Sequence, residues 1–198
     1  MDLSGNGYDF DFSNISFVGT AGGLSSGEYF KHNSSSGVFT YETSNAAWMN
    51  GLHHTNAVWS TVLWVKLTNT GGYNLFIDTN NFGGDGYNSY LNGNFYMLAL
   101  AGSSKTINNA GFGGQTSTWS MLGFSFDNAG GVSVIWYDNS STSGTHTPWS
   151  SSSSATQALQ YISTGATNFR TGLISHWDGV YLTASDYAAI YNATMTRS

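Results

Sequence analysis

The stretch WSMLGFSFDNAGGVSVIWYD, residues 119–138, carries the clearest fold signal in the chain. In its first half, Leu122, Phe124 and Phe126 occupy every second position, with smaller or polar residues between them. This spacing places alternate side chains on opposite faces of a β-strand. A second run rich in β-branched and aromatic residues follows at 132–137. The stretch therefore predicts two neighbouring antiparallel strands.

The run STVLWVKL, residues 60–67, is apolar on both faces when it is read as a strand. Two apolar residues share one face and three share the other: Val62 and Trp64 against Leu63, Val65 and Leu67. A strand that is apolar on both faces belongs where both faces of the sheet are covered. We expect this run to be a central strand.

Short runs of the same kind recur along the chain between Gly and Asn clusters. They lie at residues 37–42, 73–78, 95–100, 158–162 and 172–182. Asp138 and Asn139 follow the 132–137 run and tolerate the positive φ of a tight turn. No linker divides the runs, so we expect one domain over residues 1–198. The pattern is typical of an all-β, antiparallel two-sheet sandwich.

Only one segment predicts a helix, residues 184–193 near the C-terminus. Thr183 can cap its first turn, and Tyr187, Ile190 and Tyr191 follow at helical spacing. The sandwich should therefore carry one short C-terminal helix.

A serine-rich segment, SSTSGTHTPWSSSSS at residues 140–154, is the low-complexity stretch of the chain. We interpret it as a mobile surface loop. Its Trp149 is unexpected there, because an exposed indole is unfavourable unless it packs on a sheet or meets a ligand.

The composition argues against several classes of function. Of the 198 residues, 8% are charged, and the net charge is −6 with five Lys+Arg scattered along the sequence. Such a chain has no basic patch for nucleic acid or anionic membranes. It has no cysteine, and no apolar run approaches the roughly 18 residues of a membrane span. The first residues lack the basic and apolar regions of a secretory signal peptide.

Four stretches, in this order, resemble motifs of the laminin G-like (LamG, pentraxin-like) branch of the concanavalin A-like lectin/glucanase superfamily. They are DLSGNG at residues 2–7, TVLWVK at 61–66, the stretch 119–138, and GLISHWDGVYLT at 172–183 leading into AAIY at 188–191. Each motif is degenerate, and the specificity lies in their order and spacing over nearly the whole chain. The resemblance implies a jelly roll whose loops or concave face bind sugars.

The resemblance also implies calcium as a cofactor. Asp178 stands where the family's terminal-strand Asp often stands, and Asp2 belongs to the opening motif that lies near it in such sandwiches. Calcium prefers carboxylate, amide and backbone oxygens, in which this chain is rich. Asp178 and Asp2 are therefore the expected metal ligands, with a purely structural carboxylate at Asp178 as the open alternative.

The carboxylate signature of a glycosidase is absent from the sequence. Glycosidases of this superfamily use paired carboxylates on one strand, E-x-D-x-E or a close variant, and here Glu28 and Glu42 lie on separate segments. Asp9 and Asp11 share one side of an extended segment, an arrangement more typical of a solvated edge or of half a cation site. We expect no catalytic residue.

Sugar binding needs aromatic rings that stack on pyranose faces beside groups that hydrogen-bond to hydroxyls. The candidates are aromatic residues of predicted loops and a histidine next to one of them: Trp48, Tyr87, Tyr90, Trp149, Trp177 and His176, together with Tyr8. Core packing is an equal alternative for each loop aromatic. Trp64 and Trp136 lie within predicted strands and are expected in the core.

We therefore expect a non-catalytic carbohydrate-binding or adhesion module on a virion or other extracellular surface, a setting in which modules of this family occur. A structural virion protein, such as a capsid decoration or fibre component, is the first alternative. A polysaccharide-degrading enzyme with a non-standard carboxylate pair is the second. Contacts with other virion proteins and homo-oligomer formation stay open.

Overall fold

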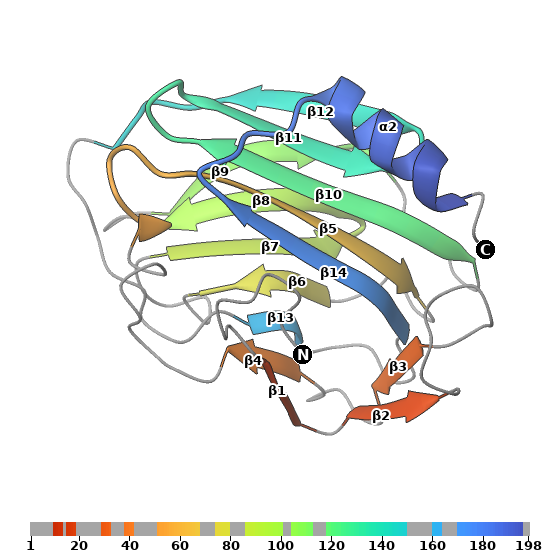
Figure 1. Ribbon diagram of the computed structural model, residues 1–198. Coiled ribbons are helices and arrows are strands. Elements are labelled where there is room, and N and C mark those ends of the chain that lie inside the picture. Colours follow the sequence, from red (N-terminus) through yellow and green to blue (C-terminus); the bar gives the residue numbers. More distant parts are fainter. Residues whose placement is uncertain are drawn as a thin grey trace.

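The computed structural model describes residues 10–13, 15–18, 29–32, 38–41, 51–67, 74–79, 86–100, 104–112, 118–149, 160–163 and 170–195. These residues form two seven-stranded antiparallel sheets that face each other, with a C-terminal helix lying on the outside of one of them (Figure 1). The predicted all-β sandwich with a short C-terminal helix is confirmed.

The first sheet, sheet A, has the strand order β1-β4-β13-β6-β7-β8-β9. Its strands are β1 (Phe10–Ser13), β4 (Val38–Tyr41), β13 (Gln160–Ser163), β6 (Asn74–Asp78), β7 (Gly86–Asn92), β8 (Asn94–Leu100) and β9 (Ser104–Ala110). β7 and β8 form a tight hairpin around Gly93, whose φ of 76° lies in the left-handed region that glycine adopts without strain.

The second sheet, sheet B, has the strand order β12-β11-β10-β5-β14-β3-β2. Its strands are β12 (Ser140–Thr145), β11 (Val132–Tyr137), β10 (Trp119–Asp127), β5 (Val58–Lys66), β14 (Arg170–Asp178), β3 (Tyr29–His32) and β2 (Ile15–Val18). β5 is the middle strand, as its two apolar faces predict. The β11–β12 turn has Asp138 at a φ of 52°, which confirms the predicted turn position.

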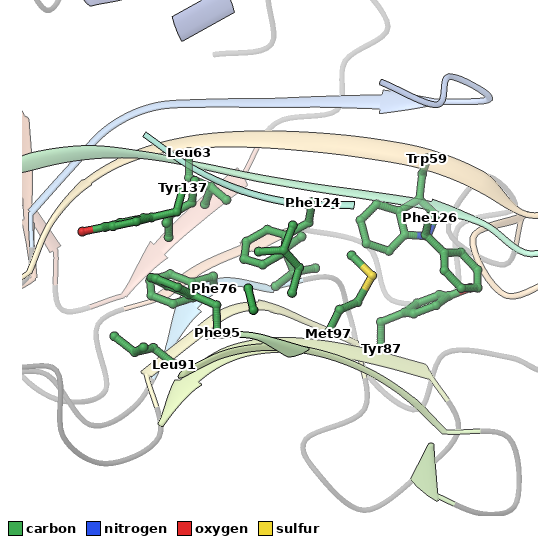
Figure 2. Packing of buried hydrophobic residues seen from close by; sticks show 14 of the residues in the cluster. Trp59, Leu63, Phe76, Tyr87, Leu91, Phe95, Met97, Phe124, Phe126 and Tyr137 are labelled. Atoms are coloured by element: carbon green, nitrogen blue, oxygen red, sulfur yellow. The ribbon is translucent and has the colours of Figure 1, made fainter. Parts of the chain in front are cut away.

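Large apolar side chains from both sheets fill the space between them (Figure 2). Leu63 of β5 and Phe124 of β10 meet Phe76 of β6 and Phe95 of β8, and all four are fully buried. The ring centroids of Phe76 lie 5.7 Å from Phe95 and 6.3 Å from Phe124. Burial of each such side chain contributes roughly 1.5–3 kcal/mol, so this layer holds the two sheets together.

The outer face of sheet B carries a second apolar cluster under the helix α2 (Ala184–Met195). Its buried members, which we call the outer cluster, are Val62, Trp64, Met121, Val134, Trp136 and Tyr187. The indole N–H of Trp64 donates to the Thr194 hydroxyl at 3.2 Å and fixes the last turn of α2. Both faces of β5 and β10 are therefore buried.

Several strands were not predicted from the sequence. β9 reads SKTINNA and β7 reads GYNSYLN, so polar residues mask their alternation. The prediction of a surface loop over residues 140–154 is wrong for residues 140–145, which form β12. Because β12 is an edge strand, its ladder to β11 and the hydrogen bond from the Asn108 side chain to the Thr142 carbonyl (2.9 Å) hold it without apolar side chains.

Within the part of the chain that the structure describes, no helix has the length and apolar character needed to cross a membrane.

Candidate functional site

A pair of tyrosines lies on the outer face of sheet A at the β7–β8 hairpin. Tyr90 and Tyr96 are Cα partners across the hairpin. Their ring centroids lie 5.0 Å apart, and the ring planes are 18° from parallel. Leu91 and Phe95, next to them in sequence, are buried between the sheets, so strand alternation turns both tyrosines away from the inter-sheet core. Both rings are half-buried, which leaves part of a stacked aromatic surface open to solvent.

Amide side chains surround this pair. Asn92 and Asn94 face each other across the hairpin turn, and Asn109 of β9 is the Cα partner of Tyr96. Asn92 and Asn109 are exposed, and Asn94 is half-buried. We call Tyr90, Tyr96, Asn92, Asn94 and Asn109 the tyrosine face. Amides donate and accept hydrogen bonds at once, as hydroxyl groups of a ligand require.

Of the residues on this face, only Tyr90 was predicted from the sequence. Tyr96 and Asn109 were missed because the sequence alone did not show that β8 and β9 pair beside β7. Asn92-Gly93-Asn94 indicates a hairpin, but a two-residue Asn-Gly turn would pair Tyr90 with Phe95, so the turn residues alone did not identify Tyr96. Positions three residues before and after Gly93 become partners once the hairpin closes.

Tyr87 and Trp149 were predicted as loop aromatics, and the structure corrects this placement. Tyr87 lies within β7 and is 1% exposed, and Trp149 is 7% exposed in the inter-sheet core. Their rings stack with centroids 5.3 Å apart. The backbone N–H of Trp149 donates to the side-chain oxygen of Asn128 at 3.0 Å, which anchors the indole against sheet B. Core packing is therefore the role of both rings in this conformation.

The two rings belong to an aromatic cluster at one end of the core, where Figure 2 shows Trp59, Tyr87 and Phe126. We call this set the end cluster; it comprises His53, Trp59, Tyr87, Phe126, His146, Trp149 and His176. The imidazole of His176 stacks on Trp59 with ring centroids 6.0 Å apart. Burial lowers the pKa of His176 to about 4. The imidazole is therefore neutral near pH 7 where it packs against the end cluster, and its contact with a ligand stays a prediction.

Trp177 and His176 do not form one site. Trp177 pairs with Ser60 and packs against the outer cluster, whereas His176 pairs with Thr61 and faces the end cluster. Successive residues of β14 thus point to opposite faces of sheet B. Trp177 is half-buried and keeps some solvent contact.

The predicted metal ligands are only partly described. Asp178 is exposed at the end of β14. Partial desolvation raises the pKa of its carboxyl group, and a hydrogen bond from the Gly179 backbone opposes this rise. Asp2 lies outside the described residues, as do Trp48 and Tyr8. No three His, Asp or Glu side chains among the residues with assigned positions are grouped so that they could hold a metal ion.

One short stretch has the spacing of a serine-hydrolase motif. The sequence GLSSG at residues 23–27 fits G-x-S-x-G, the nucleophile elbow that joins a strand to a helix in α/β-hydrolases. These residues lie outside the described ones. The sandwich architecture is a different one from the α/β-hydrolase sheet in which the motif acts, so the spacing alone assigns no chemistry to it.

No protein-family model matches this chain, and no curated protein matches its sequence. Solved structures do match the fold. The binding domain of botulinum neurotoxin DC, solved in complex with rat synaptotagmin II, superimposes with a TM-score of 0.69 at 13% identity, covering 98% of this chain and 48% of that chain.

A second match is the receptor-binding domain of the botulinum neurotoxin C/D mosaic serotype, with a TM-score of 0.67 at 12% identity, covering 96% of this chain and 48% of that chain. A third match is a structure of botulinum neurotoxin type C, whose cell entry depends on interaction with two ganglioside molecules. The superposition has a TM-score of 0.65 at 12% identity and covers 94% of this chain and 47% of that chain. This chain thus spans about half the length of the solved domains it matches. At such identities the likeness shows the β-sandwich fold, and this fold is what the chain shares with them.

Proposed function

We propose that this chain is a non-catalytic carbohydrate-binding module of the laminin G-like kind, displayed on a virion or cell surface, and that the tyrosine face binds the saccharide. The observation that carries the proposal is the stacked, half-exposed pair of Tyr90 and Tyr96 with amide groups around it. Aromatic carbon surfaces pack against the C–H faces of pyranose rings, and amides bond to the ring hydroxyls.

The position of the pair supports a binding role beyond hairpin stability. A cross-strand aromatic pair contributes roughly 0.2–1 kcal/mol to a hairpin. That contribution does not require the exposed Asn109 beside the pair. An aromatic surface bordered by uncharged hydrogen-bonding groups is the chemistry that suits a neutral saccharide.

The fold neighbours lend support of a general kind. Cell entry of botulinum neurotoxin type C depends on interaction with two ganglioside molecules, which are glycolipids, and the chain solved in that work contains a related sandwich. We transfer only the class of ligand from this comparison. Binding without turnover is the simplest role for a face whose described side chains are tyrosines and amides.

A panel of immobilised neutral polysaccharides tests the proposal. Retention of the protein on at least one of them, without release of reducing sugar over hours, is the expected result. Release of reducing sugar, or of acetate from an acetylated polysaccharide, would make the chain an enzyme instead. Failure to bind any saccharide, combined with assembly onto capsid or fibre particles, would favour the structural virion protein.

The same proposal includes a calcium ion bound by this chain. Asp178 offers an exposed carboxylate at the end of β14, and the laminin G-like resemblance pairs it with Asp2. A bound Ca²⁺ would supply charge and coordination at the rim of the sandwich.

A further inference from the structure

Three of the five basic residues in the chain stand in one row across sheet B. Arg170 of β14 is the Cα partner of Lys31 of β3 on one side and of Lys66 of β5 on the other. We call Lys31, Arg170 and Lys66 the cationic row. The three lie far apart in the sequence, so the basic residues that looked scattered along the chain are gathered by the strand register.

On β10, the strand next to β5, the indole of Trp119 lies beside the cationic row. Trp119 of β10 is the Cα partner of Lys66 on the side away from Arg170. Val65 and Leu67 belong to the inter-sheet core, so alternation along β5 places Lys66 on the outer face of sheet B. Trp119 lies on the same face, where it packs against the outer cluster. Trp119, Lys66 and Arg170 are all half-buried, so each keeps a part open to solvent.

Like charges directly opposite each other on neighbouring strands are destabilising. Among the described carboxylates of the neighbouring strands, Asp127 and Asp178 pair with Val58 and Trp59 at the other end of the nine-residue β5. That end lies more than about 20 Å from Lys66 at the usual rise per residue.

Two other features lie closer to the row. Asp138 directly follows β11, the strand on the side of β10 away from β5, and its carboxylate accepts a hydrogen bond from the Met121 N–H at 2.9 Å. The last turn of α2 ends near Trp64, and the carbonyl groups at such a helix end carry a partial negative charge. Asp138 and the end of α2 thus bring negative charge to the same end of sheet B as the cationic row.

We propose that the cationic row and Trp119 form a second binding site, separate from the tyrosine face, for an acidic saccharide. Its carboxylate or sulfate group is held by Arg170 and Lys66, and its sugar ring packs on the Trp119 indole. A guanidinium and an ammonium make charge-assisted hydrogen bonds to such anions. Neighbouring strands lie about 4.8 Å apart, so a single sugar unit spans the step from Lys66 to Trp119.

Titration with four polymers tests the site: polygalacturonate for carboxylates, dextran sulfate for sulfates, polyphosphate for a charge without a sugar, and dextran for a sugar without a charge. The wild-type protein should bind at least one of the two acidic polysaccharides more tightly than polyphosphate. Lys66→Gln and Arg170→Gln should each weaken that binding about fivefold, and raising the salt from about 50 to about 500 mM should weaken it further. Trp119→Leu should weaken the binding of acidic polysaccharides but leave the binding of polyphosphate unchanged.

Lys105→Gln on β9 of sheet A is the matched control, because it removes the same charge from the other sheet. It should change binding less than twofold. An equal loss in Lys105→Gln and Lys66→Gln, tighter binding of polyphosphate than of either saccharide, or no binding of any acidic polymer would each overturn the proposal. Dextran binding that depends on Tyr96 and not on Lys66 would support the proposed role of the tyrosine face whatever the outcome for the cationic row. The two sites are therefore tested separately.

Discussion

The ring of Tyr187 in α2 fills the space directly above Gly123 of β10. A Cβ atom added to Gly123 would overlap the Cδ1, Cε1 and Cζ atoms of that ring. Tyr187 is the fully buried residue of the helix, and its hydroxyl lies 2.7 Å from the Ser125 hydroxyl and donates to the Thr61 carbonyl at 3.3 Å. One glycine therefore determines how closely the helix docks on sheet B.

Gly123→Ala should lower the free energy of unfolding by about 2–3 kcal/mol, because neither the strand nor the anchored ring can move away without losing contacts. Urea denaturation of the variant and the wild type measures the difference. Gly111→Ala is the control, since a methyl group added there has no atom within 4 Å, and its stability should stay within about 0.5 kcal/mol of wild type. Equal stability of Gly123→Ala and the wild type would mean that α2 is not docked as described.

Tyr187→Phe should cost about 1–2 kcal/mol, because it removes one hydrogen-bond partner of the buried Ser125 hydroxyl and the donor to the Thr61 carbonyl while keeping the ring. The same substitution at Tyr191, on the half-buried side of the helix, should cost less than half as much. Chemical denaturation curves of the two variants give the comparison. A larger loss for Tyr191→Phe would contradict the buried network.

Much of this fold could be predicted because apolar alternation dominates the central strands. β5 and β10 have large side chains on both faces, so their position and the faces of Val62, Leu63 and Trp64 follow from the sequence. The edge strand β12 could not be predicted, since backbone pairing holds it and its side chains are small and polar.

Stability should fall as the pH drops from about 6.5 towards 4, because burial lowers the pKa of His176 to about 4. The unfolded chain takes up the proton at its ordinary pKa of about 6.5, while the folded chain resists it, so the stability that is present above pH 6.5 is lost progressively below it. Urea unfolding at about pH 7.5 and about pH 4.5 measures the change. His176→Phe should reduce this pH dependence by about 2–3 kcal/mol, and an unchanged pH dependence in that variant would contradict the burial of a neutral imidazole.

Calcium should raise the melting temperature by binding the native state, and a chelator should reverse the rise. Asp178→Asn should remove most of the response, since it takes away the charge of an expected ligand. A melting curve that is identical with calcium and with chelator would exclude a site of measurable affinity.

The candidate sites depend on strand register, which the sequence does not display. Tyr90 was a candidate from the sequence, although it lies in β7 and not in the predicted loop. Its partner Tyr96 and the row from Lys31 to Lys66 exist only through the pairing of strands. Trp149 was misplaced because its serine-rich surroundings suggest exposure, whereas the indole reaches into the core beside Tyr87. Local composition reports the neighbours in sequence and not the neighbours in space.

The most direct test of carbohydrate binding compares Tyr96→Ala with Tyr96→Phe by calorimetric titration against a neutral saccharide that the wild type retains. Loss of a stacking ring that contributes about 1–1.5 kcal/mol should weaken binding roughly tenfold in Tyr96→Ala. Tyr96→Phe keeps the ring and should stay within about threefold of the wild type. Unchanged affinity in a folded Tyr96→Ala variant would contradict the assignment of the tyrosine face as the binding surface.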